Sequence, residues 1–210
     1  RDANKEIYHR GPDDEGYYEN DKISFGFRRL SIIDIESGHQ PFEKDNNVII
    51  FNGEIYNHEE LRKKLEEKNH KFTTNSDTEV LLTSYIEMKE KCVEKLRGMY
   101  AFLIWDEENQ ILFGARDIFG IKPLYYFENE DFIAFSSEYK SLLLLYNERS
   151  IDEEVLQQYL SFQYTNGKGT MLKEIKKIPP HHYFTIRDDI LTIKNYYDID
   201  YKTRNDISKE

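Results

Sequence analysis

The chain has 210 residues, of which 39% are hydrophobic and 33% charged, and its 29 basic and 40 acidic residues give a formal net charge of −11. The 16 tyrosines and 13 phenylalanines exclude a disordered chain, because aromatic side chains bury large areas in a core. The acidic balance argues against a nucleic-acid partner and a polybasic membrane contact, and no apolar run approaches the roughly 20 residues of a membrane span. The single cysteine, Cys92, cannot form an intramolecular disulfide, which favours a reducing compartment, and we expect a cytoplasmic protein.

The N-terminal part of the chain is predicted to contain two strands. Residues 1–20 are polar and rich in turn-forming residues around Gly11-Pro12-Asp13-Asp14. Residues 23–35 alternate apolar and polar side chains before a mostly apolar run, which is typical of a strand. Residues 48–51 are all apolar, so this second strand is expected to be covered on both faces.

Two helices are predicted after these strands. Asn57 is a favourable N-cap with Glu60 three residues later, which is the arrangement of a capping box, and the helix is expected to end near Asn69. Ser76 and Glu79 form a second such pair at the start of the next helix. The apolar stripe of that helix consists of Val80, Leu81, Tyr85 and Met88.

Beyond Gly98, which is expected to end the helical stretch, the chain is rich in strands. A helix is predicted over residues 150–162, behind an acidic first turn that suits the helix dipole. Three hairpins are predicted, over residues 100–115, 124–136 and 183–196. This order predicts an α+β fold, in which helices cover the outside of antiparallel sheets.

Two neighbouring arginines, Arg28 and Arg29, interrupt the first apolar strand. Because side chains alternate between the two faces of a strand, the two arginines must point to opposite sides, and one of them is a candidate for holding an anion.

Three further segments have both a structural and a functional interpretation. Residues 9–13 can be a simple surface turn. Asn52-Gly53 between apolar runs is typical of a tight hairpin, but a helix cap follows almost at once. A strand that ends in an exposed Asn and Gly would instead offer a side-chain amide and an unhindered backbone N–H. Asp77 follows Ser76 at a helix start, where a capping role is a sufficient explanation.

Together these segments resemble one family. The matching strings are His9-Arg10-Gly11-Pro12-Asp13, Arg29-Leu30-Ser31-Ile32-Ile33-Asp34, Phe51-Asn52-Gly53-Glu54-Ile55-Tyr56-Asn57, Ser76-Asp77-Thr78-Glu79 and the run from Arg116 to Tyr126. In this order they resemble the N-terminal glutaminase domain of glutamine-hydrolysing asparagine synthetases, a class II glutamine amidotransferase. The resemblance implies an N-terminal-nucleophile hydrolase fold, an α/β/β/α sandwich of two antiparallel sheets with outer helices.

The resemblance also implies an enzyme that hydrolyses glutamine to glutamate and ammonia, which is passed to an ATP-activated β-aspartyl intermediate to make asparagine. An N-terminal cysteine is the nucleophile in that family, and its own α-amine is the base. Asn52 and Gly53 would then form the oxyanion hole, Arg29 would bind the α-carboxylate of glutamine, and Asp77 its α-ammonium. The rest of the glutamine pocket would be formed by Leu30, Ser31, Ile32, Ile33 and Glu54.

The chain also departs from the family pattern. The nucleophilic cysteine and its strand would precede His9 and are not in the sequence, and Cys92 is interpreted as a packing residue, so the fragment itself is expected to be inactive. We expect residues 1–200 to be the amidotransferase domain without its first strand, and residues 201–210 to begin a linker to a C-terminal synthetase domain. ATP and magnesium are expected in that absent domain, with no cofactor and no metal in this one, since the six histidines are scattered. A homodimer is also expected.

Two other functions stay open at this level. In β-lactam-forming synthetases, the same shell lacks the cysteine and serves as a structural, non-hydrolytic partner of the ATP-using half. A glutaminase could also supply ammonia to a different carboxylate acceptor. The presence of Arg29, Asn52, Gly53 and Asp77 favours glutamine hydrolysis over the structural role, because a shell that never binds glutamine has no physical need of them.

Overall fold

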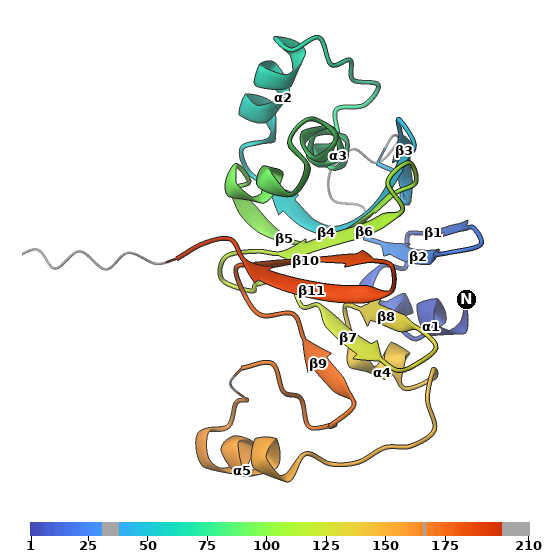
Figure 1. Ribbon diagram of the computed structural model, residues 1–210, viewed down its shortest axis with the longest axis vertical. Coiled ribbons are helices and arrows are strands. Elements are labelled where there is room, and N and C mark those ends of the chain that lie inside the picture. The colour runs from blue at the N-terminus through green and yellow to red at the C-terminus, as the bar shows by residue number, and fades with distance from the viewer. Residues whose placement is uncertain (31–37, 166, 199–210) are drawn as a thin grey trace, which may run out of the picture.

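The fold is seen in a computed structural model, which describes residues 1–30, 38–165 and 167–198. Its centre is a six-stranded antiparallel sheet with the strand order β11-β10-β6-β5-β4-β3 (Figure 1). The strands are β3 (Phe42–Lys44), β4 (Asn47–Ile55), β5 (Gly98–Asp106), β6 (Ile111–Arg116), β10 (His182–Arg187) and β11 (Ile190–Asn195). The sequence predicted the central strands and all three hairpins correctly, because their apolar runs are long and are separated by polar turns.

A second layer of strands lies on one face of the central sheet. It consists of the pair β1 (Asp14–Glu19) and β2 (Ser24–Arg29), and the three-stranded sheet β8-β7-β9, formed by Ile133–Ser136, Tyr125–Glu128 and Ile175–Lys177. Phe25 of β2 and Tyr126 of β7 pack in one apolar cluster with Leu103 and Trp105 of β5. The two layers of antiparallel strands therefore share a core.

Helices α2 (His58–Glu66) and α3 (Asp77–Met88) cover the opposite face of the central sheet, with a 3₁₀ segment at Lys89–Glu94 (Figure 1). Alternate residues of β5 explain why it is apolar throughout: Phe102 and Ile104 pack under the helices, whereas Leu103 and Trp105 face the second layer. Short helices α1 (Asp2–Lys5) and α4 (Tyr139–Leu142) and the longer α5 (Glu153–Phe162) lie beyond the second layer. The α/β/β/α sandwich expected from the sequence is confirmed.

Neither capping box predicted from the sequence forms in full, although Ser76 acts as the predicted cap of α3. Asn57 precedes α2, but its side chain accepts a hydrogen bond from Arg97 N at 2.9 Å and donates to Lys95 O at 2.9 Å. Ser76 does cap α3 by accepting from Thr78 N at 3.0 Å. The Glu79 carboxylate, however, binds the backbone N–H groups of the preceding loop instead of that of Ser76. Spacing predicted the helix starts but not the partners of these side chains.

Some elements were missed or misplaced by the sequence analysis. The polar residues 1–20 contain α1, a 3₁₀ turn at Tyr8–Arg10 and strand β1. Strand β1 has an unusually polar sequence, and it is held in place by pairing along its whole length with β2. Gly98 does not end a helix but begins β5: α3 ends at Met88, with Lys89 as its C-cap at a φ of 51°, and the 3₁₀ segment that follows ends at Glu94. The strands β3 and β9 have three residues each, too few for a recognisable pattern.

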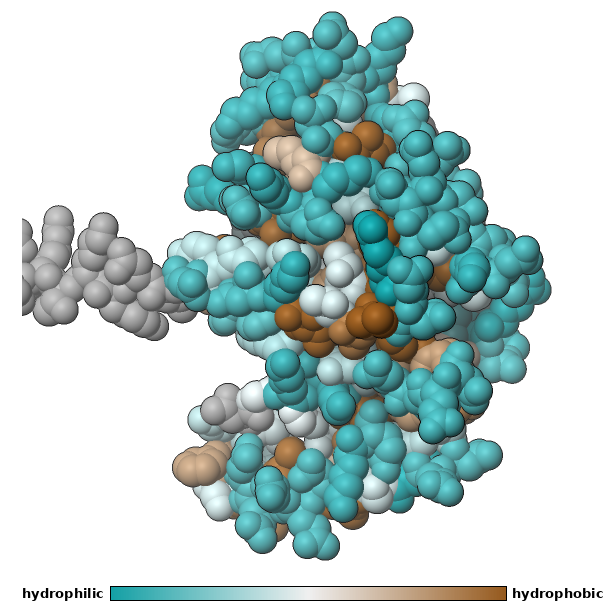
Figure 2. All heavy atoms as spheres, in the orientation of Figure 1, coloured by the Kyte–Doolittle hydropathy of each residue, from teal (hydrophilic) through white to brown (hydrophobic). Residues whose placement is uncertain are grey.

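Hydrophilic side chains cover most of the face seen in Figure 2, with small apolar areas between them. No helix in the described part of the chain is both long and apolar enough to cross a membrane. Cys92 is fully buried in the core under α3, and burial raises the pKa of its thiol, which confirms the packing role predicted for it.

Candidate functional site

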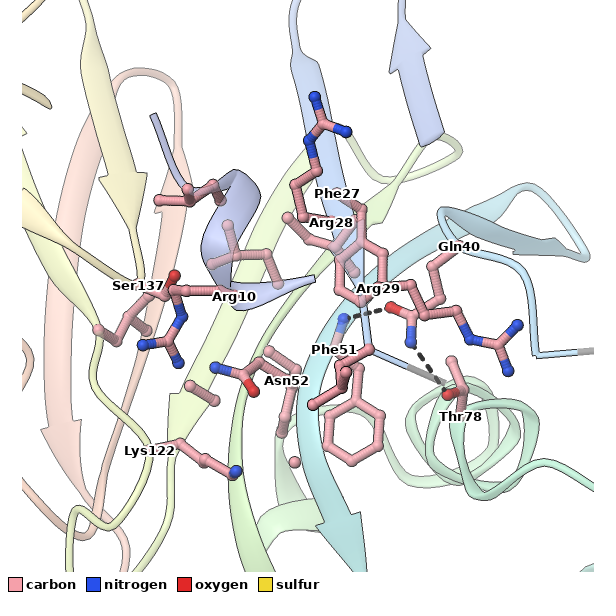
Figure 3. A pocket seen from close by; sticks show the side chains of 18 of the residues that line it. Arg10, Phe27, Arg28, Arg29, Gln40, Phe51, Asn52, Thr78, Lys122 and Ser137 are labelled. Atoms are coloured by element: carbon pink, nitrogen blue, oxygen red, sulfur yellow. Dashed lines mark hydrogen bonds between the residues drawn. The ribbon is translucent and has the colours of Figure 1, made fainter. Parts of the chain in front are cut away.

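A cavity of about 390 Å³ lies where β2, β4 and the start of α3 meet, and β8 contributes a further wall (Figure 3). Six of the predicted site residues line it: Arg29, Leu30, Asn52, Gly53, Glu54 and Asp77. The other three, Ser31, Ile32 and Ile33, lie outside the described residues. The structure thus brings together residues that are far apart in the sequence, while the role of each one stays a prediction.

Asn52 and Gly53 are part of strand β4 and do not form a hairpin turn. They pair with Ala101 and Tyr100 in an uninterrupted ladder between β4 and β5. A Cβ at Gly53 would overlap the carbonyl oxygen of Met99, and φ at Gly53 is +152°, a value that favours glycine. The close approach of the two strands therefore requires a glycine at this position.

Gly98, at the other end of the same contact, is subject to a matching constraint. A Cβ there would overlap the carbonyl oxygen of Glu54 on β4. The two glycines lie near each other on facing strands, Ile55 being the direct partner of Gly98. Neither position 53 nor position 98 therefore has room for a side chain.

The hydrogen bonds around Gly53 show where its N–H points. Its partner on β5, Tyr100, uses its own N–H and C=O on Asp117, on the β6 side, at 3.2 and 2.8 Å. Residues 53 and 100 therefore form a non-hydrogen-bonded pair, and the N–H of Gly53 faces away from β5, toward the cavity edge. The side-chain amide of Asn52 forms no hydrogen bond with any described residue, and Figure 3 shows it facing the cavity. Two donors are thus available on adjacent residues.

Asp77 is the first residue of α3 and reaches β4 directly. Its Oδ2 accepts a hydrogen bond from Ile55 N at 2.9 Å. Burial raises the pKa of this carboxyl above its ordinary value, although the hydrogen bond from Ile55 and the nearby His58 act in the opposite direction. The contact joins the acidic group to the strand that carries Asn52 and Gly53.

Arg28 and Arg29 point in different directions, as the alternation of strand side chains predicted (Figure 3). Arg28 forms an ion pair with Glu15 at 2.7 Å and lies over the ring of Tyr8. Arg29 is 9% exposed and extends toward the start of α3, near Thr78. Arg29 is therefore the arginine that lies on the same side as Asp77.

Further cavity residues received no role from the sequence analysis. Arg10 faces the cavity from the 3₁₀ turn, and its guanidinium donates to Glu138 Oε1 at 3.2 Å. Lys122 faces it from a loop whose backbone N–H groups are bound by the Asp117 carboxylate, including that of Lys122 at 3.0 Å. Gln40 lines it between β4 and α3. Arg10 and Lys122 lie within matching strings, but no local pattern indicates that they would meet.

The cavity wall carries charges of both signs. Arg29 extends toward the start of α3, whose first residue is Asp77, whereas Asn52, Arg10 and Lys122 lie on the other side of the view (Figure 3). A cation and an acid on one side of a pair of neutral donors suit a free amino acid, whose backbone is a zwitterion and whose side chain ends in a polar group. Among the described residues, no group of three or more His, Cys, Asp and Glu side chains could hold a metal ion.

Comparison with known proteins gives a family match over nearly the whole chain. A family model described as a glutamine amidotransferase domain matches residues 1–197. The chain is 51% identical to asparagine synthetase [glutamine-hydrolyzing] 1 of Bacillus subtilis, covering 96% of this chain and 32% of the relative. It is 40% identical to synthetase 3 of the same organism, covering 94% and 33%. The chain thus spans about a third of the length of these relatives.

Solved structures show the same fold at lower identity. A glutamine phosphoribosylpyrophosphate amidotransferase from B. subtilis, complexed with ADP and GMP, matches with a TM-score of 0.57 and 22% identity, over 82% of this chain and 34% of that one. A class-II glutamine aminotransferase domain protein from Silicibacter pomeroyi matches with a TM-score of 0.51 and 14% identity, over 88% and 91%. These likenesses support the fold.

Proposed function

Since the chain belongs to the glutamine amidotransferase domain family, we propose that it is the glutaminase half of a glutamine-hydrolysing asparagine synthetase. The observation that supports this most directly is the convergence of Arg29, Asn52, Gly53 and Asp77 on one cavity. The 51% identity to a synthetase of that name supports the same reading.

In the proposed complex, glutamine lies with its α-carboxylate at Arg29 and its α-ammonium at Asp77. A guanidinium matches a carboxylate with two parallel hydrogen bonds, and an ionised carboxylate attracts an ammonium group. The side chain of glutamine then extends toward Asn52 and Gly53. The amide of Asn52 and the N–H of Gly53 would stabilise the oxyanion that forms when the substrate carbonyl is attacked.

Cys92 does not fit the role of nucleophile in this reaction. Cys92 is fully buried in the core beneath α3, and burial raises the pKa of its thiol, so it is neither accessible nor activated. We propose that an N-terminal cysteine attacks the side-chain amide, with its α-amine as base, and that ammonia leaves for a second domain. That domain would bind ATP and magnesium and activate aspartate.

The test uses the full-length polypeptide with glutamine, aspartate and ATP. Glutamate release together with asparagine formation is the expected result. Glutamate release without asparagine would mean that ammonia goes to a different acceptor. If no glutamate forms, the glutaminase proposal is wrong and a structural role of the domain is favoured.

Substitution of the carboxylate-binding arginine tests the substrate itself. We expect Arg29→Lys to raise KM for glutamine about tenfold or more, because a single ammonium cannot reproduce the two-pronged guanidinium contact. Steady-state glutaminase kinetics measure the change, and Arg187→Lys, an exposed arginine at the end of β10, is the matched control. An unchanged KM in Arg29→Lys would contradict the assignment.

A further inference from the structure

Gln40 connects the two elements that carry the predicted site residues. Its side-chain Oε1 accepts a hydrogen bond from Phe51 N on β4 at 2.6 Å, and its Nε2 donates to Thr78 Oγ1 on α3 at 3.4 Å (Figure 3). These partners are the immediate sequence neighbours of Asn52 and Asp77. Gln40 is only 7% exposed, so both contacts are made away from bulk water.

The position of these bonds matters because the edge of β4 is only partly covered by β3. Strand β3 pairs with residues 47–49 of β4 and no further. Beyond that point, the N–H groups on this edge belong to Phe51, Gly53 and Ile55, since alternate residues of a strand point to the same side. Side chains bind the outer two: Gln40 binds Phe51 N, and Asp77 binds Ile55 N. Gly53 N, between them, faces the cavity.

A side-chain amide at this place does what a longer β3 could not do. A continued strand would bind the edge of β4 along its length and would cover Gly53. One amide oxygen fixes the strand at a single point, two residues before Gly53, and leaves the next N–H on that edge open.

Gln40 is itself held from the β1 side. A Cβ at Gly16 of β1 would overlap the backbone carbonyl of Gln40 and crowd the ring of Pro41. The backbone of Gln40 therefore lies directly on β1, and its side chain reaches from there between β4 and α3. Fixed at one end by β1, the side chain can hold the other two elements in register.

We propose that Gln40 is a positioning residue of the glutaminase site, which keeps the Gly53 N–H and the Asn52 amide aimed at one point by binding Phe51 N and bridging to Thr78. The inference rests on the proposed function, because it assigns Gln40 to the geometry of the oxyanion hole. It predicts that Gln40 affects the chemical step and not the binding of the α-carboxylate and α-ammonium groups of glutamine.

The experiment compares Gln40→Met with the wild type in the full-length polypeptide. Methionine keeps the length and volume of the side chain but forms neither hydrogen bond. We expect kcat for glutamine hydrolysis to fall about 10- to 100-fold, because small displacements of transition-state donors are costly. KM for glutamine should change less than about threefold, because Arg29 and Asp77 still bind the substrate backbone. The amide of Phe51 should exchange with solvent faster.

Two other variants separate positioning from general stability. Gln40→Glu keeps an oxygen for Phe51 N and can accept from the Thr78 hydroxyl, so its kcat should lie clearly above that of Gln40→Met. Thr170→Val is the matched control: this buried threonine donates to Ile175 O at 2.9 Å in the β9 region, away from the cavity. It should lower Tm without lowering kcat. If Gln40→Met does not fold, Gln40→Asn, one methylene too short to bridge, carries the same expectation.

The outcomes distinguish the two proposals. An inactive wild type overturns the proposed function and this inference with it. An active wild type with an equally active Gln40→Met variant overturns the role of Gln40 alone. A loss that appears only in KM, or that Thr170→Val reproduces, also overturns it.

Discussion

Helices α3 and α5 are capped in the same way, but they differ strongly in how much of each helix is buried. Ser76 caps α3 by accepting from Thr78 N, and Asp152 caps α5 by accepting from Val155 N at 3.1 Å. Yet residues 78–85 of α3 are all buried, whereas Val155 is the only buried residue of α5. An N-cap shows where a helix starts. How deeply the helix is buried depends on what the rest of the chain packs against it.

The difference matters for the site. Helix α3 packs against β4, and both elements contribute residues to the cavity. Helix α5 lies at the opposite end in Figure 1 and contributes no lining residue among those described. Leu160 and Phe162 of α5 are 72% and 66% exposed. Matched substitutions in the two helices therefore separate the effect of local helix contacts from the effect of tertiary packing on stability and activity.

The largest expected contrast is in core packing. Leu81→Ala on α3 removes a fully buried side chain and should lower the free energy of unfolding by about 2–5 kcal/mol. Leu160→Ala on α5 should change it by no more than about 0.5 kcal/mol. Urea denaturation of both variants measures the difference. Similar losses would mean that α5 is packed far better than its exposure indicates.

A contrast in turnover follows from the position of the oxyanion donors. Asn52→Ala should lower kcat for glutamine hydrolysis about 100- to 1,000-fold, with a much smaller effect on KM, because the amide acts mainly in the transition state. Gln158→Ala on α5 serves as the control and should leave kcat unchanged. Equal effects of Asn52→Ala on kcat and KM would argue for a binding role instead.

The caps should give equal effects despite their different surroundings. Ser76→Ala and Asp152→Ala each remove one side-chain hydrogen bond to a helix N-terminus and should each cost about 1 kcal/mol of unfolding free energy. Thermal denaturation compares the two. A much larger loss for Ser76→Ala would show that this cap also supports tertiary packing around α3.

The smallest effect concerns Asp77 and depends on pH. Burial raises the pKa of its carboxyl above the ordinary 3.8, so its contribution to stability is fully present below that value and is lost as the pH rises through the raised pKa. At neutral pH, Asp77→Asn should therefore increase the free energy of unfolding, since the amide oxygen can still accept from Ile55 N. The gain should disappear in acid.

The same variant should weaken glutamine binding at neutral pH, because the neutral amide cannot pair with the α-ammonium. Urea titrations at two pH values and calorimetric titration with glutamine measure the two effects. A variant that loses stability at neutral pH would show that the buried charge is favourable where it lies.

The sequence was sufficient to predict those parts of the fold that are marked by a long apolar run or by a local capping residue. The apolar runs of β4 and β5 and the cap of α3 were predicted correctly. Strand β1 could not be predicted, because its polar residues become a strand only through pairing with β2. Glu79 was assigned to the wrong partner, because spacing does not reveal the loop that folds back to it.

The candidate site also contains residues that the sequence could identify and one, Gln40, that it could not. Family resemblance identified Arg29, Asn52 and Asp77, and the structure places all three around one cavity. Gln40 had no signal of its own, because its role depends on β3 ending early and on β4 passing beside α3. Residues that act by joining elements are visible only after those elements have been placed.

The facing glycines of β4 and β5 limit how this part of the molecule can evolve. Gly53 and Gly98 each occupy a position where any added carbon meets the backbone of the other strand. Most crowded positions in a core can drift in pairs, one residue growing while its neighbour shrinks. Here an added carbon would meet backbone atoms, which no substitution can make smaller, so divergence of this segment must leave both glycines in place or separate the two strands.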